Sequence, residues 1–571
     1  MLDRLPPEVL LIALEPADLS QYITRHDLNN ICRVSKHLYA IAVPLLYKSV
    51  ILTSDRPGIS ETWHHVDSLL RAPVFPVGLL VHMRDIEIQE NRSWHGDGCL
   101  HNYTWRFMPI NNELVHDNQD YYKEARIKRD EIRYLSSKLL HVFSRCPADR
   151  LQRFSWNIRT CLPSEILGDS GYLILNQRKL VAIHLRTGSF CAAGGSDILL
   201  SKFACLRSIS WLDLCYEHHV RELCLALKSN AFHLTQMNLG VTDTSGDEVT
   251  QSIKSMLAKE ILDMHNWRTA FRFPVLQDLS FYYMDLTPIS HVLSSIFNVT
   301  SLLSLSLRLC KSWEYALFNF LNSGSRIALK TLTLETHLRR AEEDSFLAIP
   351  AFLKSFEGLE ELYISVPFFE SPVPLWRSVL THKKTLRKLV CQQLHIDGCL
   401  YEEHGLYLGA TGFLEQLKGA DRNPSIGPNL VFLGKSSKDF NTLKSILTSP
   451  GLKANIRVLH LRRCEGFYDQ SCSMTPDCGD DISNKNLPSF RRFLTWAFGS
   501  KGPPELQAVG HYAFVSMQPR DVFYFRDAQY EDGYRCVIRR RSKRFDLFRQ
   551  YRYALDACRH DDSLWIDGPL D

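Results

Sequence analysis

A six-residue pattern, Leu-x-x-Leu-x-Leu or a close relative, recurs along this chain and limits its possible folds more than any other feature. Apolar residues at alternate positions are what a strand with one buried face requires. Neighbouring copies are mostly about 26 to 30 residues apart, which leaves room for one helix between successive strands. Clear copies begin at residues 206, 234, 276, 302, 329, 359, 386 and 456, and weaker copies begin at 151, 180 and 429.

Stretches with a helical spacing of apolar residues lie between these strands, so each repeat is expected to contain one strand and one helix. Stacked repeats of this kind form an α/β fold in which parallel strands line a curved solenoid. An irregular α/β domain is the alternative. The expected helices span residues 220–227, 289–297, 315–321, 346–356 and 440–447.

The repeats resemble the leucine-rich repeat class in a degenerate form. The consensus of that class has Asn or Cys after the strand, and Cys215, Cys310 and Cys464 fit this position. The period breaks near 242–272 and 394–434, and these insertions either contact a partner or are tolerated surface loops. We therefore divide the chain into a helical segment (1–50), a linker with atypical first solenoid turns (51–150), the solenoid (151–512) and a C-terminal cap or tail (513–571).

The first fifty residues contain short amphipathic helical patterns that bury little surface by themselves. Pro6 and Pro7 suit a first helical turn, where a missing N–H loses no partner. Asp27 and Ser35 are expected N-caps of the following helices, and Pro44 is expected to stop or restart the last one. A segment this apolar needs a partner, either the rest of the chain or another protein.

Four short motifs in this segment occur in the order found in the F-box, particularly the form common in fungal proteins. They are LPPEVL at 5–10, Asp27-Leu28, VSKHL at 34–38 and PLLY at 44–47; the stretch 15–26 between the helices is longer than usual. The resemblance implies a three-helix unit that binds the SKP-type adaptor of cullin–RING ubiquitin ligases. The alternative is an N-terminal helical cap on the solenoid. The implied adaptor contacts are Leu5, Pro6, Val9, Leu10, Leu28, Ile31 and Val34.

Sequence patterns of known catalytic and nucleotide sites are missing from this chain. There is no G-x-x-x-x-G-K-[ST] loop, no G-x-S-x-G elbow and no H-E-x-x-H pair. His460, Cys464, Cys472 and Cys478 are metal-ligand types without a C-x-x-C pair, so we expect a polar loop rather than a zinc site. No cofactor, no metal and no catalytic activity are expected.

Composition and charge are those of an ordinary folded protein. The 67 basic and 63 acidic residues give a formal net charge of +4, which provides no overall drive toward nucleic acid or membrane. No signal peptide or membrane span is expected, so the protein should lie in the cytoplasm, the nucleus or both. Cys205, Cys224, Cys310 and Cys391 are expected to be buried and reduced. The basic run 539–544 is either a nuclear-import signal or a solvated surface.

Together these features predict a non-catalytic substrate receptor that binds an adaptor through its first helices and a protein target through its strands. The alternative is an interaction scaffold that acts outside any ligase. Strand alternation places one set of polar residues on the face opposite the buried leucines, where a target could contact them. These predicted target contacts are Gln236, Asn238, Ser304, Ser306, Thr331, Thr333, Glu361 and Tyr363.

Overall fold

The computed structural model divides the chain into two compact units, which are described separately. One unit runs to Leu276 and includes Tyr282–Pro288, and the other contains Gln277–Phe281 and continues from Ile289. The structure describes residues 6–7, 9–10, 25–54, 77–90, 133–158, 161–187, 198–214, 216–241, isolated positions in 253–260, 273–336, 345–367, 373–394, 432–436, 443–462 in part, 487–513, 520–530 and 533–538.

The first unit begins with two helices and continues as a parallel sheet whose strand order is the chain order. Its helices are α2 (Arg25–Cys32), α3 (Lys36–Leu46), α7 (Ser164–Leu167), α8 (Tyr172–Asn176) and α9 (Glu217–Asn230), with 3-10 turns η3 (Val77–His82) and η5 (Leu200–Lys202). Its strands are β1 (Ser49–Ser54), β2 (Asp85–Glu90), β3 (Arg153–Asn157), β4 (Ala182–Arg186), β5 (Ser208–Leu214) and β6 (Gln236–Val241).

The second unit also contains a sheet in chain order, which is parallel from β8 to β14 and antiparallel from β14 to β16. Its strands are β7 (Asp278–Tyr282), β8 (Ser304–Arg308), β9 (Thr331–Glu335), β10 (Glu361–Pro367), β11 (Lys388–Leu394), β12 (Phe432–Ser436), β13 (Val458–Arg462), β14 (Ala508–Ala513), β15 (Arg520–Arg526) and β16 (Tyr534–Ile538). Its helices are α11 (Leu293–Ile296), α12 (Trp313–Asn322), α13 (Ser345–Lys354), α14 (Val373–Val379), α17 (Pro450–Asn455) and α19 (Leu487–Phe498), with η7 (Leu380–His382).

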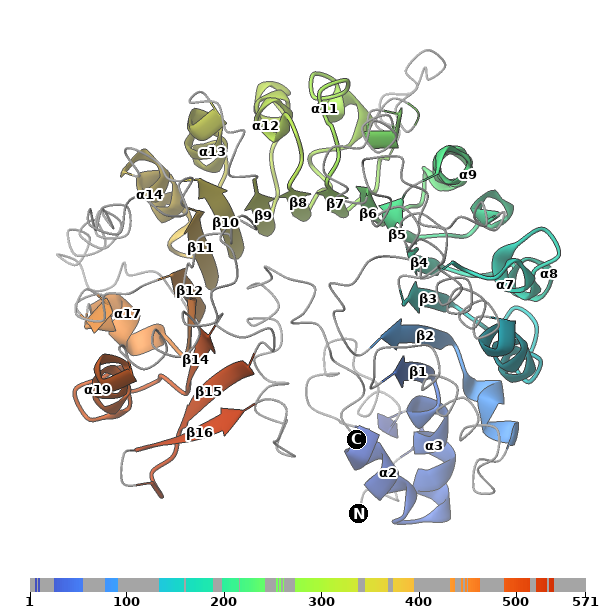
Figure 1. Cartoon of the computed structure of the whole chain (residues 1–571), viewed down its shortest axis with the longest axis horizontal. Helices are drawn as coiled ribbons and strands as arrows, with labels where there is room; N and C mark the ends of the chain where they lie inside the picture. The colour runs from blue at the N-terminus through green and yellow to red at the C-terminus, as the bar shows by residue number, and fades with distance from the viewer. Residues whose placement is uncertain are drawn as a thin grey trace, which may run out of the picture. The chain divides into compact units, whose positions relative to one another are not determined.

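Every copy of the repeated pattern coincides with a strand, so the predicted α/β fold with a long parallel sheet is confirmed. The strand begins two residues after the first apolar residue of the pattern, as in Leu359 before β10. Leu359, Leu362 and Ile364 are all buried, because the helices cover this face of the sheet. In Figure 1 the labelled helices of the second unit lie on one side of its strands. One repeat therefore buries its apolar side between its own strand and helix.

Several sequence expectations need correction. β1 begins at Ser49, inside the segment expected to be helical (1–50), and continues with β2 into the stretch 51–150, where a linker and atypical first solenoid turns are expected; SVILTS and DIEIQE alternate without the leucine signature. The helix expected over 289–297 is only Leu293–Ile296. Cys224 and Cys310 are buried thiols as predicted, but Cys205 is exposed. The side chain of Cys391 and the positions Cys215 and Cys464 lie outside the described residues.

The N-terminal helices follow the predicted capping only in part. Ser35 is the N-cap of α3, and its Oγ accepts from the N–H of Leu38 at 3.2 Å. Asp27 is not a cap, because α2 begins two residues earlier at Arg25 and holds Asp27 in its first turn. Pro44 does not stop α3, which continues to Leu46. The carbonyl of Ala40 loses a donor there, but Ala40 is exposed and water can replace it.

A buried polar side chain connects each of three repeats to the repeat before it, and the first two examples lie in the first unit. Asn230 ends α9; its Oδ1 accepts from the N–H of Leu206 at 2.9 Å and its Nδ2 donates to the carbonyl of Phe203 at 2.8 Å. Gln177 follows α8, accepts from the N–H of Leu151 at 2.9 Å and donates to the carbonyl of Pro147 at 3.0 Å. Both side chains are fully buried. They satisfy the backbone groups that the turn into a strand would leave without partners.

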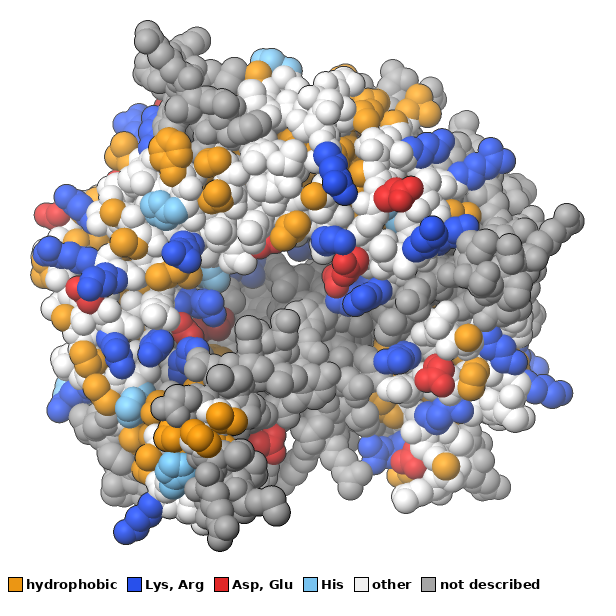
Figure 2. Space-filling view, turned by 180° about the vertical axis from the view of Figure 1, so that it is seen from behind, with side chains coloured by type: hydrophobic (Ala, Val, Ile, Leu, Met, Phe, Trp, Pro, Cys, Tyr) orange, Lys and Arg blue, Asp and Glu red, His pale blue; other side chains and the backbone are white. Residues whose placement is uncertain are grey.

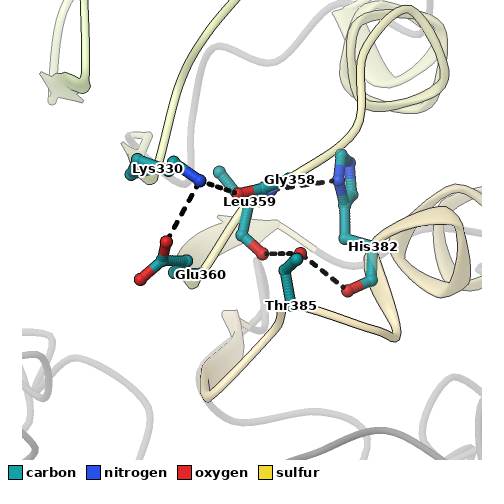
Figure 3. Close-up of polar contacts among 6 residues, drawn as sticks. All are labelled: Lys330, Gly358, Leu359, Glu360, His382 and Thr385. Carbon is teal, nitrogen blue, oxygen red and sulfur yellow. Dashed lines mark hydrogen bonds and ion pairs between the residues drawn. The ribbon is translucent and has the colours of Figure 1, made fainter.

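His382 performs the same task in the second unit. Its Nδ1 accepts from the N–H of Leu359 at 3.4 Å, and Nε2 contacts the carbonyl of Leu353 at 2.9 Å, which assigns the proton to Nε2. Figure 3 shows this joint together with Thr385, whose hydroxyl donates to the carbonyl of Leu359 at 2.8 Å. On the other side Lys330 donates to the carbonyl of Gly358 at 3.3 Å. Burial lowers the pKa of His382, which favours the neutral ring that this geometry needs.

Near the C-terminal end of the described sheet, a single arginine connects the last hairpin to a helix. The guanidinium of Arg526, at the end of β15, donates to the carbonyls of Pro503 at 2.8 Å and Leu506 at 2.9 Å. It also donates to the carbonyl of Phe498 at 3.1 Å, at the C-terminal end of α19. A cation at that end complements the helix dipole and satisfies carbonyls that the helix cannot. Arg526 thereby fixes the antiparallel hairpin β15–β16 to the last helix.

Replacing Asn230 should destabilise the first unit. Asn230→Leu leaves the N–H of Leu206 and the carbonyl of Phe203 without their partner, which we expect to cost about 2–4 kcal/mol of unfolding free energy. Urea unfolding measures the difference. Arg221→Ala on the exposed side of the same helix is the control and should change stability by less than about 1 kcal/mol. Equal effects of the two changes would contradict the assigned role.

Acid should weaken the hydrogen bonds that His382 makes with the backbone of the preceding repeat. The pKa of His382 is lowered in the folded chain, so below the unfolded value of about 6.5 only the unfolded chain takes up the proton. The free energy of unfolding that His382 contributes is therefore fully present above about pH 6.5 and decreases as the pH falls toward the folded-state pKa. His382→Gln copies the side chain of Gln177 and should fold at pH 7 with less loss of stability on acidification. His291→Gln, at an exposed position, should keep the wild-type pH profile; identical profiles for all three proteins would refute the prediction.

Candidate functional site

The N-terminal helices are built on a small apolar cluster that belongs to the chain itself. Leu10, Leu38 and Ile41 form this cluster, and Ile31 packs against it. The N–H of Leu10 donates to the carbonyl of Pro6 at 3.1 Å, which is a helical turn. The first helical stretch, α2 and α3 therefore share one interior.

The predicted adaptor contacts divide between this interior and the surface. Leu10, with 2% of its surface exposed, is buried and cannot be a surface contact in this conformation, and Leu28 is also buried. Val9 is 45% exposed and Val34 is 70% exposed. Pro6 is exposed and Ile31 is half-buried, whereas Leu5 lies outside the described residues. Among the described large apolar side chains of this unit, Val9, Val34 and Tyr39 are exposed.

The predicted target contacts lie on the strand face opposite the buried leucines. In the first unit Gln236 is exposed and Asn238 is half-buried, and Nδ2 of Asn238 donates to Oγ of Ser210 at 3.1 Å. In the second unit the sheet register aligns Ser304 with Thr331 and Ser306 with Thr333, and all four are half-buried.

Two further predicted contacts lie on β10 of the same face. Glu361 aligns with Thr331 and is half-buried, so it remains accessible. Tyr363 aligns with Thr333 but is only 5% exposed, so the prediction that a target reaches it is wrong for this conformation. Strand alternation fixes the side of the sheet correctly, but it contains no information about what covers each position.

Ion pairs connect neighbouring strands on this face. Arg308 of β8 contacts Glu335 of β9, with Nε and Oε2 at 2.7 Å, and Glu335 is only 3% exposed. Lys388 contacts Glu361 with Nζ and Oε1 at 2.6 Å. These two pairs hold four charged side chains in fixed positions beside the hydroxyl groups of this face.

The first unit contains an equivalent pair with a distorted backbone. Arg186 of β4 contacts Asp213 of β5, with Nε and Oδ2 at 2.9 Å. Asp213 lies in a bulge, where β5 contributes one residue more than β6 between Trp211 and Leu214, and it has φ of 61°. Asp tolerates this left-handed conformation better than most residues. The bulge turns the carboxylate toward Arg186.

These charged residues were missed by the sequence reasoning, although a signal exists. The pattern x-Leu-x-Leu-Arg, with Ile in place of the first Leu in one copy, ends three strands, at Arg186, Arg308 and Arg462. A basic residue repeated at the same strand position indicates a shared role on one face. The acidic partners give no comparable signal, because Asp213 comes from a bulge and Glu335 is one of many carboxylates.

Other sequence candidates remain outside the described residues. These include Cys464, Cys472 and Cys478 of the possible metal group, the basic run 539–544 and most of the two insertions. Among the side chains that the structure describes, no three His, Cys, Asp or Glu residues are placed to hold a metal ion. No described helix combines the length and apolarity needed to cross a membrane. In comparisons with known proteins, no family model matches this chain and no curated protein matches it.

Removing Arg308 should destabilise the second unit. Arg308→Ala leaves the carboxylate of Glu335 buried beside a gap, and we expect a loss of about 2–3 kcal/mol of unfolding free energy, less than for a fully buried pair. Adding Glu335→Gln should recover part of the loss. The exposed pair Lys330–Glu360 supplies the control, since Lys330→Ala should cost less than about 1 kcal/mol. Strictly additive single effects in urea unfolding would show that the pair is not coupled.

Proposed function

We propose that this chain is the substrate-recognition subunit of an SCF-type cullin–RING ubiquitin ligase. In this proposal the N-terminal helices bind an SKP-type adaptor, and the polar strand face binds a protein target. The F-box-like motifs in residues 5–47 and the repeat pattern behind them support it. The observation that carries it is the exposure of two valines, Val9 and Val34, on a helical unit whose Leu10, Leu38 and Ile41 are buried.

The division of side chains in the helical unit suits a docking surface. Leu10 and its neighbours anchor the helices from inside, so Val9, one residue away, is held on a structured support. Exposed apolar side chains gain free energy when a partner removes them from water. A preformed surface also loses little entropy on binding. A second protein with an apolar groove is therefore the expected partner.

The role of the sheet would be to bind and not to react. Its accessible residues are hydroxyl and amide side chains and paired charges, which suit hydrogen bonds to a polypeptide. A target held there would be near the ubiquitin-conjugating enzyme that the cullin brings. Its effective concentration would rise without a catalytic residue in this chain.

Charged substitutions on the exposed valines should disrupt adaptor binding. Val9→Asp together with Val34→Asp should weaken binding to a purified SKP-type adaptor by roughly tenfold or more, because a carboxylate would enter an apolar contact. Val275→Asp is the matched control, since Val275 is 41% exposed in the same unit but outside the helical segment. Leu10→Asp is unsuitable because it would unfold the helices.

Co-purification from cells distinguishes the two functional classes. A ligase subunit should recover both the adaptor and a cullin, and both should disappear in the double valine variant. Adaptor without cullin would indicate a scaffold outside the ligase. A wild-type chain that recovers neither protein would refute the proposed function.

A further inference from the structure

The amino-terminal ends of the strands in the first unit form a regular edge. The residue before each strand donates its N–H to the carbonyl of the equivalent residue one strand earlier, as in Arg84 to Lys48 at 2.8 Å and Gln152 to Arg84 at 2.7 Å. The series continues with Arg207 to the carbonyl of Val181 at 2.7 Å. Side chains at these positions are therefore in a row, with neighbouring strands about 5 Å apart.

This row carries mainly positive charge. In β1 to β5, the last residue before each strand contributes the cations Lys48, Arg84 and Arg207, and the first residue within each strand, which forms the next row of the register, contributes the cation Arg153 and the single carboxylate Asp85. Arg153 and Arg207 are exposed. Within the described part of the chain, neither they nor Arg84 form an ion pair.

One carboxylate, Asp85, lies among these four cations and can offset only one of their charges. Asp85 is partly buried, and burial raises its pKa against the opposing influence of Arg153, Lys48 and Arg84. Arg153 also contributes to the lowered pKa of His184 on the next strand, after the larger effect of burial. The guanidinium of Arg153 thus acts on groups of both neighbouring strands, β2 and β4.

At the same positions of β7 to β14 in the second unit, the charges nearly balance. There the cations are Lys330, Arg387, Lys388 and Arg457, and the carboxylates are Asp278, Glu360 and Glu361. Lys330 pairs with Glu360 at 3.1 Å and Lys388 with Glu361 at 2.6 Å. The repeat geometry is shared, so the excess charge of the first unit is a property of its side chains. Figure 2 shows that Lys and Arg are more widespread than Asp and Glu on one face of the molecule.

We propose that the strand-start edge of β1 to β5 binds an acidic segment of another polypeptide. Guanidinium groups pair with carboxylates in a two-pronged geometry, and a row of them matches Glu or Asp side chains along an extended chain. Single-stranded nucleic acid is the less suitable occupant, because its bases stack on aromatic side chains and the strand-start positions of β1 to β6 contain none. The proposal stands independently of the ligase role.

Fluorescence anisotropy of the full chain tests this edge. The probe is a fluorescein-labelled peptide of alternating Glu and Ser, with a Gln–Ser peptide and a short single-stranded DNA for comparison. We expect the Glu–Ser peptide to bind most tightly and to weaken with added salt. Arg153→Gln with Arg207→Gln should lower its affinity by about tenfold, as expected for two partly solvated ion pairs.

A control of equal charge change comes from the second unit. Lys384→Gln with Arg387→Gln removes two exposed cations, one of them at a strand start beside Glu360 and Glu361, and should leave the affinity within about twofold. An equal loss of affinity in both variants would show that only the net charge of the chain matters, and it would overturn the proposal. It would also be overturned if the Gln–Ser peptide bound as well as the Glu–Ser peptide, or if the DNA bound more tightly.

Discussion

The satisfaction of buried backbone groups between consecutive repeats is the constraint on which this structure depends. Each repeat turns from a helix into a strand inside the protein, where N–H and carbonyl groups cannot reach water. Asn230, Gln177 and His382 each place one acceptor and one donor there, facing the preceding repeat. Apolar burial stabilises the layers, but it is not directional, so these hydrogen bonds fix how one repeat sits on the next.

The sequence was sufficient to predict the strands but not the buried polar side chains that connect one repeat to the next. A strand with one buried face needs alternating apolar residues, and that requirement is visible in every copy from 151 to 456. Such a connecting side chain needs only one hydrogen-bond donor and one acceptor at the right place. Gln, Asn and His all meet that need, so no repeated letter marks the position.

The candidate site shows the same difference between pattern and environment. Alternation placed Ser306, Thr333 and Tyr363 on the correct side of the sheet, yet Tyr363 is covered. The motif LPPEVL indicated a partner surface, yet the structure divides it between buried Leu10 and exposed Val9. Burial results from contacts between segments far apart in the sequence, which a local pattern cannot contain.

The reversal of strand direction at β15 has a consequence for how such a chain can change in length. From β8 to β14 each strand presents the same parallel edge to its successor, so a duplicated repeat could be inserted there and find a matching neighbour. Beyond β14 the edge is antiparallel and Arg526 fixes it to α19. Growth by duplication is therefore open to the parallel array from β8 to β14, whereas the hairpin β15–β16 follows that array and is held to α19 by Arg526.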